Sequence, residues 1–257
     1  MAAPGEPVPI LHQDDDVVVV HKPSGMLVHR SGLDPHETRF VVQLLRAQLR
    51  RRVFPVHRLD KGASGALVLG LHREAAAALA EGVRERRVKR TYVAIVRGHP
   101  PEEGVIDYPL RRLHDPAEPA RGNRDGGEPT GEARQAALTR FRRLATAELP
   151  HRVDRYPTSR YSLLRLEPET GRRHQIRRHL DHVSHPIVGD STYGKGRHNR
   201  LFAELFGVSR LLLACVEARL AHPRDGAPLV VAAPLAPEMA RVVAALGWTD
   251  ALPEGWR

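Results

Sequence analysis

Apolar residues along the chain occur in short runs between polar turns, and their spacing predicts both strands and helices. The unbroken run VVVV at 17–20 lies between three aspartates and an HKPSG turn, a pattern typical of a buried strand. Apolar residues at helical spacing predict a helix over 40–51. An alanine-rich stretch that begins with an acid and ends with cations predicts a second helix over 73–88. Alternating and β-branched residues predict strands at 90–98 and 160–168.

The C-terminal part of the chain predicts two strands and a closing helix. The segments 210–223 and 228–234 are apolar and are joined by an RDG turn. Residues 236–248 have helical spacing and a glycine, Gly247, where the helix would stop. Strands outnumber helices and do not alternate strictly with them. This favours an α+β fold, a mixed and mainly antiparallel central sheet with helices packed on it, over a doubly wound parallel sheet.

One segment has almost no apolar content and many Pro and Gly residues, which predicts an exposed loop over 113–134. This loop does not separate two self-sufficient halves, and the chain has no internal repeat. A chain of 257 residues is long enough for one large domain or two modest ones. We therefore expect a single domain over 1–257, without an additional N-terminal RNA-binding module.

The charge of the chain points to a polyanionic partner. Lys and Arg number 40 against 30 Asp and Glu, a formal net charge of +10. Such a surface favours nucleic acid or an anionic membrane. No apolar run approaches the roughly 18 residues of a spanning helix, so no membrane partner is expected. A coding bias toward Ala, Arg, Gly and Pro could raise the bulk charge, but it would not cluster the cations locally.

The compartment follows from the cysteine count and the start of the chain. The first residues, MAAPGEPVPI, lack a charged region followed by an apolar one, so no export signal is expected. The single cysteine, Cys215, excludes an internal disulfide and favours a reducing compartment, which predicts a cytoplasmic protein.

Several common chemistries lack their motifs. Four histidines lie close together at 174, 179, 182 and 185, but their spacing forms no zinc-binding pair, so no metal is expected. A Walker loop is absent, and so is a dinucleotide-binding glycine motif after a strand. Neither GAS at 62–64 nor GDS at 189–191 forms a nucleophile elbow.

Two segments remain as candidates. In HRLDKGASGALVLG, residues 57–70, the carboxylate of Asp60 precedes a run of small residues that would let the backbone approach another group closely. In TGRRHQIRRHLDHVSHP, residues 170–186, a helical reading places apolar residues on one face and Arg173 and Arg177 beside it. A guanidinium at such a boundary can reach into a cleft. The alternatives are a turn or cap role for Asp60 and a solvated basic helix at 170–186.

The HRLD segment resembles the active-site motif of the RluA-type pseudouridine synthases. Other resemblances follow the family's order along the chain: HKPSGMLVHRSG (21–32), VKRTYVAIVRG (88–98), TGRRHQIRRHL (170–180), HPIVGDSTYG (185–194) and LAHP (220–223). The segments LVHRSGLD, RYPTSRYSLL and GWTDALPE are most similar to the branch that modifies uridine 65 of tRNA. One position departs from the family, since Ala214 stands where a histidine is usual, which puts a packing or secondary contact in doubt.

The resemblance implies the pseudouridine synthase fold and an isomerase that converts a uridine of tRNA to pseudouridine without a cofactor. It implies that Asp60 acts on the ribose, that Arg177 pairs with it, and that Tyr92 lies against the uracil. Arg58 would fill the gap that the extruded base leaves. Further RNA contacts are expected from His57, Lys22, His29, Arg30, Arg172, Arg173 and Arg178. A monomer is expected, and no protein partner is implied.

Three other functions stay open at this point. A synthase of the same family could modify rRNA instead of tRNA. A non-catalytic RNA-binding protein could use the same basic surface. A small-molecule glycosidase normally pairs two carboxylates, and no second acid accompanies Asp60 within its motif.

Overall fold

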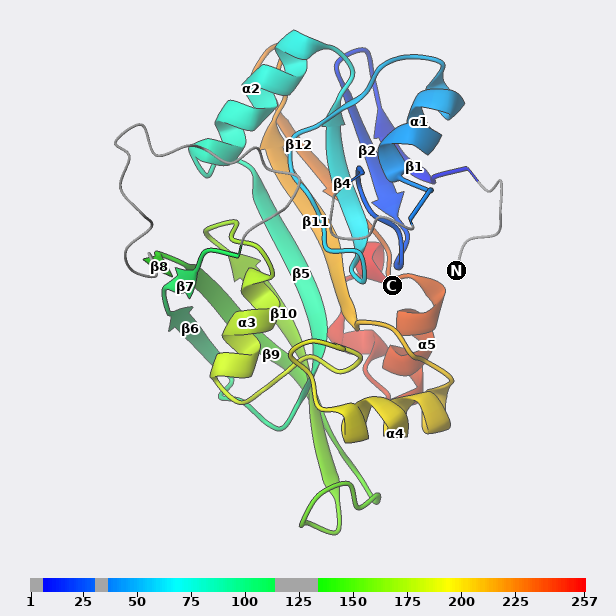
Figure 1. The fold of residues 1–257 in the computed structure, drawn as a ribbon, viewed down its shortest axis with the longest axis vertical. Helices are drawn as coiled ribbons and strands as arrows, with labels where there is room; N and C mark the ends of the chain where they lie inside the picture. Colours follow the sequence, from blue (N-terminus) through cyan, green and yellow to red (C-terminus); the bar gives the residue numbers. More distant parts are fainter. Residues whose placement is uncertain (1–6, 31–36, 114–133) are drawn as a thin grey trace.

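The computed structural model describes residues 7–30, 37–113 and 134–257, which form one large β-sheet with helices on both faces (Figure 1). The strands are β1 (Ile10–Gln13), β2 (Val17–Lys22), β3 (Phe54–Pro55), β4 (Ser64–Gly70), β5 (Lys89–Arg97), β6 (Glu103–Asp107), β7 (Leu110–Arg111), β8 (Arg134–Gln135), β9 (Leu138–Leu149), β10 (Ser159–Pro168), β11 (Leu213–Ala221) and β12 (Pro228–Ala232). The helices are α1 (Val41–Leu49), α2 (Arg73–Arg84), α3 (Gln175–His182), α4 (Gly196–Phe206) and α5 (Pro237–Ala245), followed by short 3₁₀ turns at Thr249–Ala251 and Glu254–Trp256.

The main sheet has ten strands and is mixed. Its order is β1-β2-β4-β11-β5-β10-β9-β6, with β12 paired to β11 and β3 paired to β4. The pairing of β4 with β11 is parallel, and the other pairings along this order are antiparallel. Strands from both ends of the chain therefore meet in the middle of the sheet, where β11 lies between β4 and β5.

The two faces of the sheet carry separate cores, as the alternation along β5 shows. Tyr92, Ala94 and Val96 pack in one cluster with apolar residues of α1, α2 and α3. Val93 and Ile95 pack in the other, with apolar residues of α4 and α5. Because successive side chains of a strand point to opposite faces, Tyr92 lies on the same face as α3. This face holds the candidate site.

Of the small residues at 62–66, two glycines serve the packing of the sheet, whereas Ala63 lines the pocket of Asp60. A Cβ on Gly65 would lie 2.0 Å from the carbonyl oxygen of Cys215 on β11. Gly65 also has a φ of +104°, which favours glycine. A Cβ on Gly62 would lie 3.0 Å from the Cβ of Leu211. The run lets β4 and the residues before it lie against β11.

Most predicted elements are present, and several further ones were missed. The expected strands and helices correspond to β2, α1, α2, β5, β10, β11, β12 and α5. Of the helix expected over 170–186, only α3 is helical, and the residues from Thr170 to His174 form a loop. The elements not predicted from the sequence are the helix α4, the long strand β9 and the shorter strands β1, β3, β6, β7 and β8. The loop expected at 113–134 lies outside the described residues except at its two ends.

Candidate active site

Asp60 lies in the loop between β3 and β4, where it is anchored by its neighbours. Leu59 is buried in the core, and the amide of Ala63 donates to the carbonyl oxygen of Asp60 at 3.1 Å. This turn leaves the carboxylate partly exposed, with 19% of the side chain accessible. The guanidinium of Arg177, from α3, donates through one nitrogen to Oδ2 of Asp60 at 3.2 Å. The two residues are 117 positions apart, and the structure brings them together as the sequence analysis expected.

Arg177 makes a closer contact with a second carboxylate, that of Asp190. Its Nε and the other terminal nitrogen donate to the two oxygens of Asp190 at 2.6 and 2.8 Å. The amides of Thr192 and Tyr193 also donate to Oδ1 of Asp190. Burial acts to raise the pKa of Asp190, but the hydrogen bonds from Arg177 and these amides outweigh it and hold the pKa below its ordinary value. Asp190 is therefore an ionised anchor for Arg177.

No role was predicted for Asp190 from the sequence. The residue lies in GDS, which is not a nucleophile elbow, and in HPIVGDSTYG. A signal was present, because an aspartate followed by small polar residues often accepts backbone N–H groups two and three positions on. The distance along the chain between Asp190 and Arg177 gave no indication of their contact.

Tyr92 projects from β5 into the same pocket and is 6% exposed. Its cross-strand partner on β11 is Cys215. Burial raises the pKa of Tyr92 above its ordinary value, and burial raises the pKa of Cys215 to about 12. The phenol and the thiol therefore both stay protonated at neutral pH.

These side chains line a pocket of about 350 Å³, which is partly open to solvent. Of the residues that the sequence analysis singled out, the pocket contains Asp60, Tyr92, Arg177, Arg58, His57, Arg172 and Arg173. It also contains Arg90 and His174, which were not predicted. The ring of His174 shares a hydrogen bond of 3.1 Å with the hydroxyl of Tyr193, and the guanidinium carbon of Arg177 lies 5.0 Å from the centre of the Tyr193 ring.

The expectation that Lys22 contacts RNA is wrong in this structure. Its side chain is fully buried, and its Nζ donates to the carbonyl oxygens of Pro23, Met26 and Lys61. Burial lowers its pKa to about 7. The alternation along β2 points Lys22 inward, where its three hydrogen bonds join the turn after β2 to the loop that carries Asp60.

His57 lines the pocket but offers no positive charge. Its Nε2 accepts a hydrogen bond from the amide of Val68 at 3.1 Å, and burial lowers its pKa to about 3. The ring is therefore neutral. It can shape the pocket, but it cannot bind a phosphate as a cation.

Three other predicted contacts lie away from the pocket. His29 and Arg30 are exposed at the end of the segment after β2, and neither is among the residues that line the pocket. Arg178, on α3, donates to the carbonyl oxygen of Arg111 at 2.9 Å and is directed away from Asp60. Ala214, where the family usually has histidine, is buried on β11 and pairs with Ser64 of β4.

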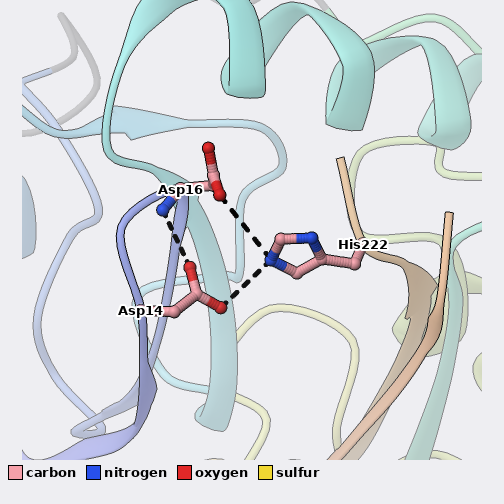
Figure 2. Close-up of side chains that lie close together, drawn as sticks. All are labelled: Asp14, Asp16 and His222. Carbon is pink, nitrogen blue, oxygen red and sulfur yellow. Dashed lines mark hydrogen bonds and ion pairs between the residues drawn. The ribbon is translucent and has the colours of Figure 1, made fainter. Parts of the chain in front are cut away.

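One group in the described residues has an arrangement that could hold a metal, and it lies away from the pocket. Figure 2 shows Asp14 and Asp16 of the β1–β2 turn facing His222 after β11, whose Nε2 lies 3.1 Å from Oδ2 of Asp14. A guanidinium nitrogen of Arg224 already lies 2.7 Å from Oδ2 of Asp16, and His72 contacts Oδ1 at 2.8 Å. These cations satisfy the carboxylates, so we assign the cluster to fastening the β1–β2 turn to β11 and α2.

The four histidines at 174–185 diverge in the fold. His179 contacts Thr139, His185 contacts the carbonyl of Arg97, and His182 stacks on Tyr108. No helix in the described parts of the chain has the length and apolar character to cross a bilayer.

Comparisons with known proteins agree with this arrangement. Residues 16–182 match the family described as RNA pseudouridylate synthase. The chain is 44% identical over 243 residues to a Vibrio cholerae protein named tRNA pseudouridine synthase C, covering 95% of this chain and 97% of that protein. A Salmonella typhi protein of the same name is 44% identical over 248 residues, covering 96% and 93%. The solved structure of Human RNA Pseudouridylate Synthase Domain Containing 4 has a TM-score of 0.67 at 26% identity, covering 93% of each chain. The predicted fold is therefore confirmed.

Proposed function

Because the chain belongs to the RNA pseudouridylate synthase family, we propose that it converts a uridine of tRNA, at position 65, to pseudouridine, with Asp60 as the group that acts on the ribose. The observation that carries this proposal is the partly exposed carboxylate of Asp60 beside the buried guanidinium of Arg177, in a pocket that also holds Tyr92. The relatives named tRNA pseudouridine synthase C support tRNA as the substrate.

The reaction breaks the C1′–N1 bond of uridine, turns the uracil, and forms a new bond from C1′ to C5. The hydrogen on C5 then leaves as a proton, and N1 gains one, so the product is an isomer of the substrate. Breaking the glycosidic bond develops positive charge on the ribose, as in other glycosyl chemistry. An ionised carboxylate next to C1′ and C2′ stabilises this charge, which is the role we give to Asp60.

Arg177 provides a fixed positive charge beside the carboxylate of Asp60 when a base and a sugar close over it. Excluding water from a carboxylate favours its neutral form, and a fixed cation nearby opposes this. The bidentate contact with Asp190 fixes the guanidinium and leaves one terminal nitrogen for Asp60. These two contacts need the several N–H donors of a planar guanidinium. Lysine has a single ammonium group and could not bind both carboxylates in this geometry.

Tyr92 is placed to act on the base. An aromatic ring can stack on the uracil while its oxygen lies near C5, where the proton must leave. The raised pKa of Tyr92 means that its hydroxyl stays protonated in the free enzyme. It can therefore orient the base through a hydrogen bond. It can relay the C5 proton only if it passes its own hydroxyl proton to solvent as it takes up the proton from C5.

The remaining cations of the pocket serve extrusion and phosphate binding. Extruding a nucleotide costs a few kcal/mol, less in a loop than in a helix. Arg58, two residues before Asp60, occupies the space of the extruded base, and Arg172 and Arg173 hold phosphates at the rim. Arg30, His29 and Arg178 are assigned to more distant RNA contacts. We propose that the chain acts as one domain, as a monomer, in the cytoplasm.

Mapping pseudouridines in bulk RNA from a strain that lacks the gene tests the substrate. We expect one tRNA position to lose its pseudouridine, and to recover it with the wild-type gene but not with Asp60→Asn. Loss of an rRNA pseudouridine with intact tRNA would reassign the substrate within the family. An unchanged pattern in all RNA would contradict the proposed function.

A further inference from the structure

A second hollow adjoins the pocket of Asp60 and has no role in the reaction described above. It measures about 670 Å³ and lies between the α2–β5 turn, the end of β10 and the loop before α3. Figure 1 shows this turn, at the end of the cyan helix α2, on the same side of the sheet as that loop. The hollow and the pocket share six lining residues: Val83, Arg90, Pro168, Thr170, Gly171 and Arg172. The two therefore form one continuous depression, and we call the second hollow the arginine groove.

The arginine groove is strongly cationic. Eight arginine and lysine side chains and two glutamates line it. The cations are Arg84, Arg86, Lys89, Arg90, Arg140, Arg165, Arg172 and Arg219. Clefts lined by charge of one sign focus the field and raise the local concentration of a ligand of opposite charge.

The cations of this groove differ in their partners. Four of them pair with carboxylates: Arg84 with Glu81, Arg140 with Glu169, Arg165 with Glu167 and Arg219 with Glu217. The side chains of Arg86 and Lys89 are exposed and, within the part of the chain that the structure describes, form no hydrogen bond or ion pair. The α2–β5 turn therefore presents charge that the protein itself does not use.

Arg90 lies at the junction of the groove and the pocket. It is half-buried, its Nε is enclosed without a hydrogen-bond partner, and no carboxylate of the described residues pairs with it. A guanidinium that is partly withdrawn from water and has no carboxylate partner can bind an anion that enters the groove. Tyr92 lies two positions further along β5, on the same face of the strand, and lines the pocket. An anion bound to Arg90 would therefore lie next to the uridine.

We propose that the arginine groove holds the RNA strand on one side of the target uridine, with Arg90 binding a phosphodiester that flanks this uridine. The inference rests on the proposed function and extends it from Arg172, already assigned to phosphate binding, to Arg86, Lys89 and Arg90, to which no role has been given. None of the described residues that line the groove is aromatic. The groove therefore contacts the phosphates and not stacked bases, and it reads the course of the strand without reading its sequence.

The first test compares two double variants, each of which replaces two cations by glutamine. The affinity of each for a tRNA transcript is measured at increasing salt concentration. Arg86→Gln with Lys89→Gln removes two groove charges. The control, Arg152→Gln with Arg155→Gln, removes two exposed charges from the β9–β10 hairpin, which extends from the opposite end of the molecule (Figure 1). We expect the groove pair to weaken binding on the order of tenfold and to reduce the salt slope by about 1–2. The control pair should change neither.

The second test addresses Arg90 with a single neutral methylphosphonate placed on either side of the target uridine. At one of the two positions this substitution should weaken binding to the wild type on the order of tenfold, and binding to Arg90→Gln by much less, because the contact is already lost. Arg90→Lys, which keeps the charge, should retain part of the effect.

The outcomes separate the groove from the reaction. If the groove and control double variants lose equal affinity for tRNA, the groove does not bind the RNA strand. The same conclusion follows if the methylphosphonate weakens binding equally in the wild type and Arg90→Gln. Absence of pseudouridine formation by the wild type in the same samples would instead overturn the proposed function, whatever the binding data show.

Discussion

Arg177 divides its guanidinium between two carboxylates, and the division is unequal. Two hydrogen bonds of 2.6 and 2.8 Å go to Asp190, and one of 3.2 Å goes to Asp60. Charge-assisted bidentate pairs are the stronger and more directional kind. Asp190 therefore fixes the guanidinium, while Asp60 receives part of its charge and keeps its capacity to interact with the ribose.

Asp190 is accordingly a positioning residue. We expect Asp190→Asn to lower kcat on the order of 10²-fold, because a displacement of about 1 Å at the reacting groups has this effect. The KM for tRNA should change little, since Asp190 is buried behind Arg177. Glu204→Gln, which removes an exposed charge on α4, is the control. Thermal unfolding must show that the variant is folded, and an unchanged kcat in a folded variant would contradict this role.

Tyr92→Phe tests the hydroxyl of Tyr92 without removing its ring. If the hydroxyl takes part in moving the C5 proton, product formation should fall roughly 10²-fold or more, in the range of general acid–base effects. Binding of tRNA should be retained, because the ring still packs in the pocket. Tyr156→Phe removes an exposed hydroxyl on the β9–β10 hairpin and should have no effect. A fully active Tyr92→Phe enzyme would limit Tyr92 to stacking.

The sequence identified some of these residues and not others for physical reasons. Asp60, Tyr92 and Arg177 lie in motifs that resemble those of a family, so their chemistry could be named before their geometry. The burial of Lys22 could not be read from HKPSG, because the motif does not show which side of β2 faces the core. The partners of Asp190 and the position of Arg90 between the pocket and the groove depend on contacts between distant segments.

At the scale of elements, the loop before α3 decides where the arginines of TGRRHQIRRHL point. Gln175 is buried at the start of α3, and its Oε1 accepts from the hydroxyl of Thr170 and the amide of Arg172. Its Nε2 donates to the carbonyl oxygen of Leu138 and contacts the hydroxyl of Thr139 on β9. The helix expected from residue 170 begins later because these hydrogen bonds hold the preceding segment as a loop.

Gln175→Ala should therefore destabilise this loop. Leaving buried polar groups without partners costs about 1–3 kcal/mol, so we expect the free energy of unfolding to fall by about that amount. The Tm should fall by on the order of 5 °C for a chain of this size. The matched control is Gln43→Ala on α1, which is exposed. A thermal melt that shows equal Tm values for both variants would contradict this account.

The contact between the β1–β2 turn and α2 gives stability a pH dependence. The hydrogen bond from His72 is the main cause that lowers the pKa of Asp16 below 3.8, and the same bond raises the pKa of His72 above 6.5. The stabilisation from Asp16 is present above pH 3.8 and is lost as the pH falls through its folded pKa. That from His72 is complete below pH 6.5 and is lost as the pH rises through its folded pKa.

His72→Ala should therefore lower the Tm more at pH 5.5 than at pH 8.5, both measured by thermal unfolding in low salt. His99→Ala is the control, because the hydrogen bond of His99 goes to the carbonyl oxygen of Ala147 and not to a carboxylate. An equal loss at the two pH values for His72→Ala would show that the ion pair contributes nothing.

At the scale of the whole molecule, the sheet brings together segments that the sequence keeps far apart. Asp60, Tyr92 and Arg177 come from a loop, a central strand and a helix on one face, while α4 and α5 cover the other. The α+β class followed from the irregular alternation of strands and helices. The strand order could not be read, because the parallel pairing of β4 with β11 joins Ser64 to Ala214 and has no local signal.

The central claim is that Asp60, paired with Arg177, is required to break the glycosidic bond. Release of tritium from C5 of labelled uridine in a tRNA transcript measures it directly, because this hydrogen leaves only after the base has been reattached. The wild type should release tritium from the modified uridine, whereas Asp60→Asn should bind the same tRNA and release it on the order of 10³-fold more slowly or not at all. Tritium release by Asp60→Asn at the wild-type rate would contradict the account.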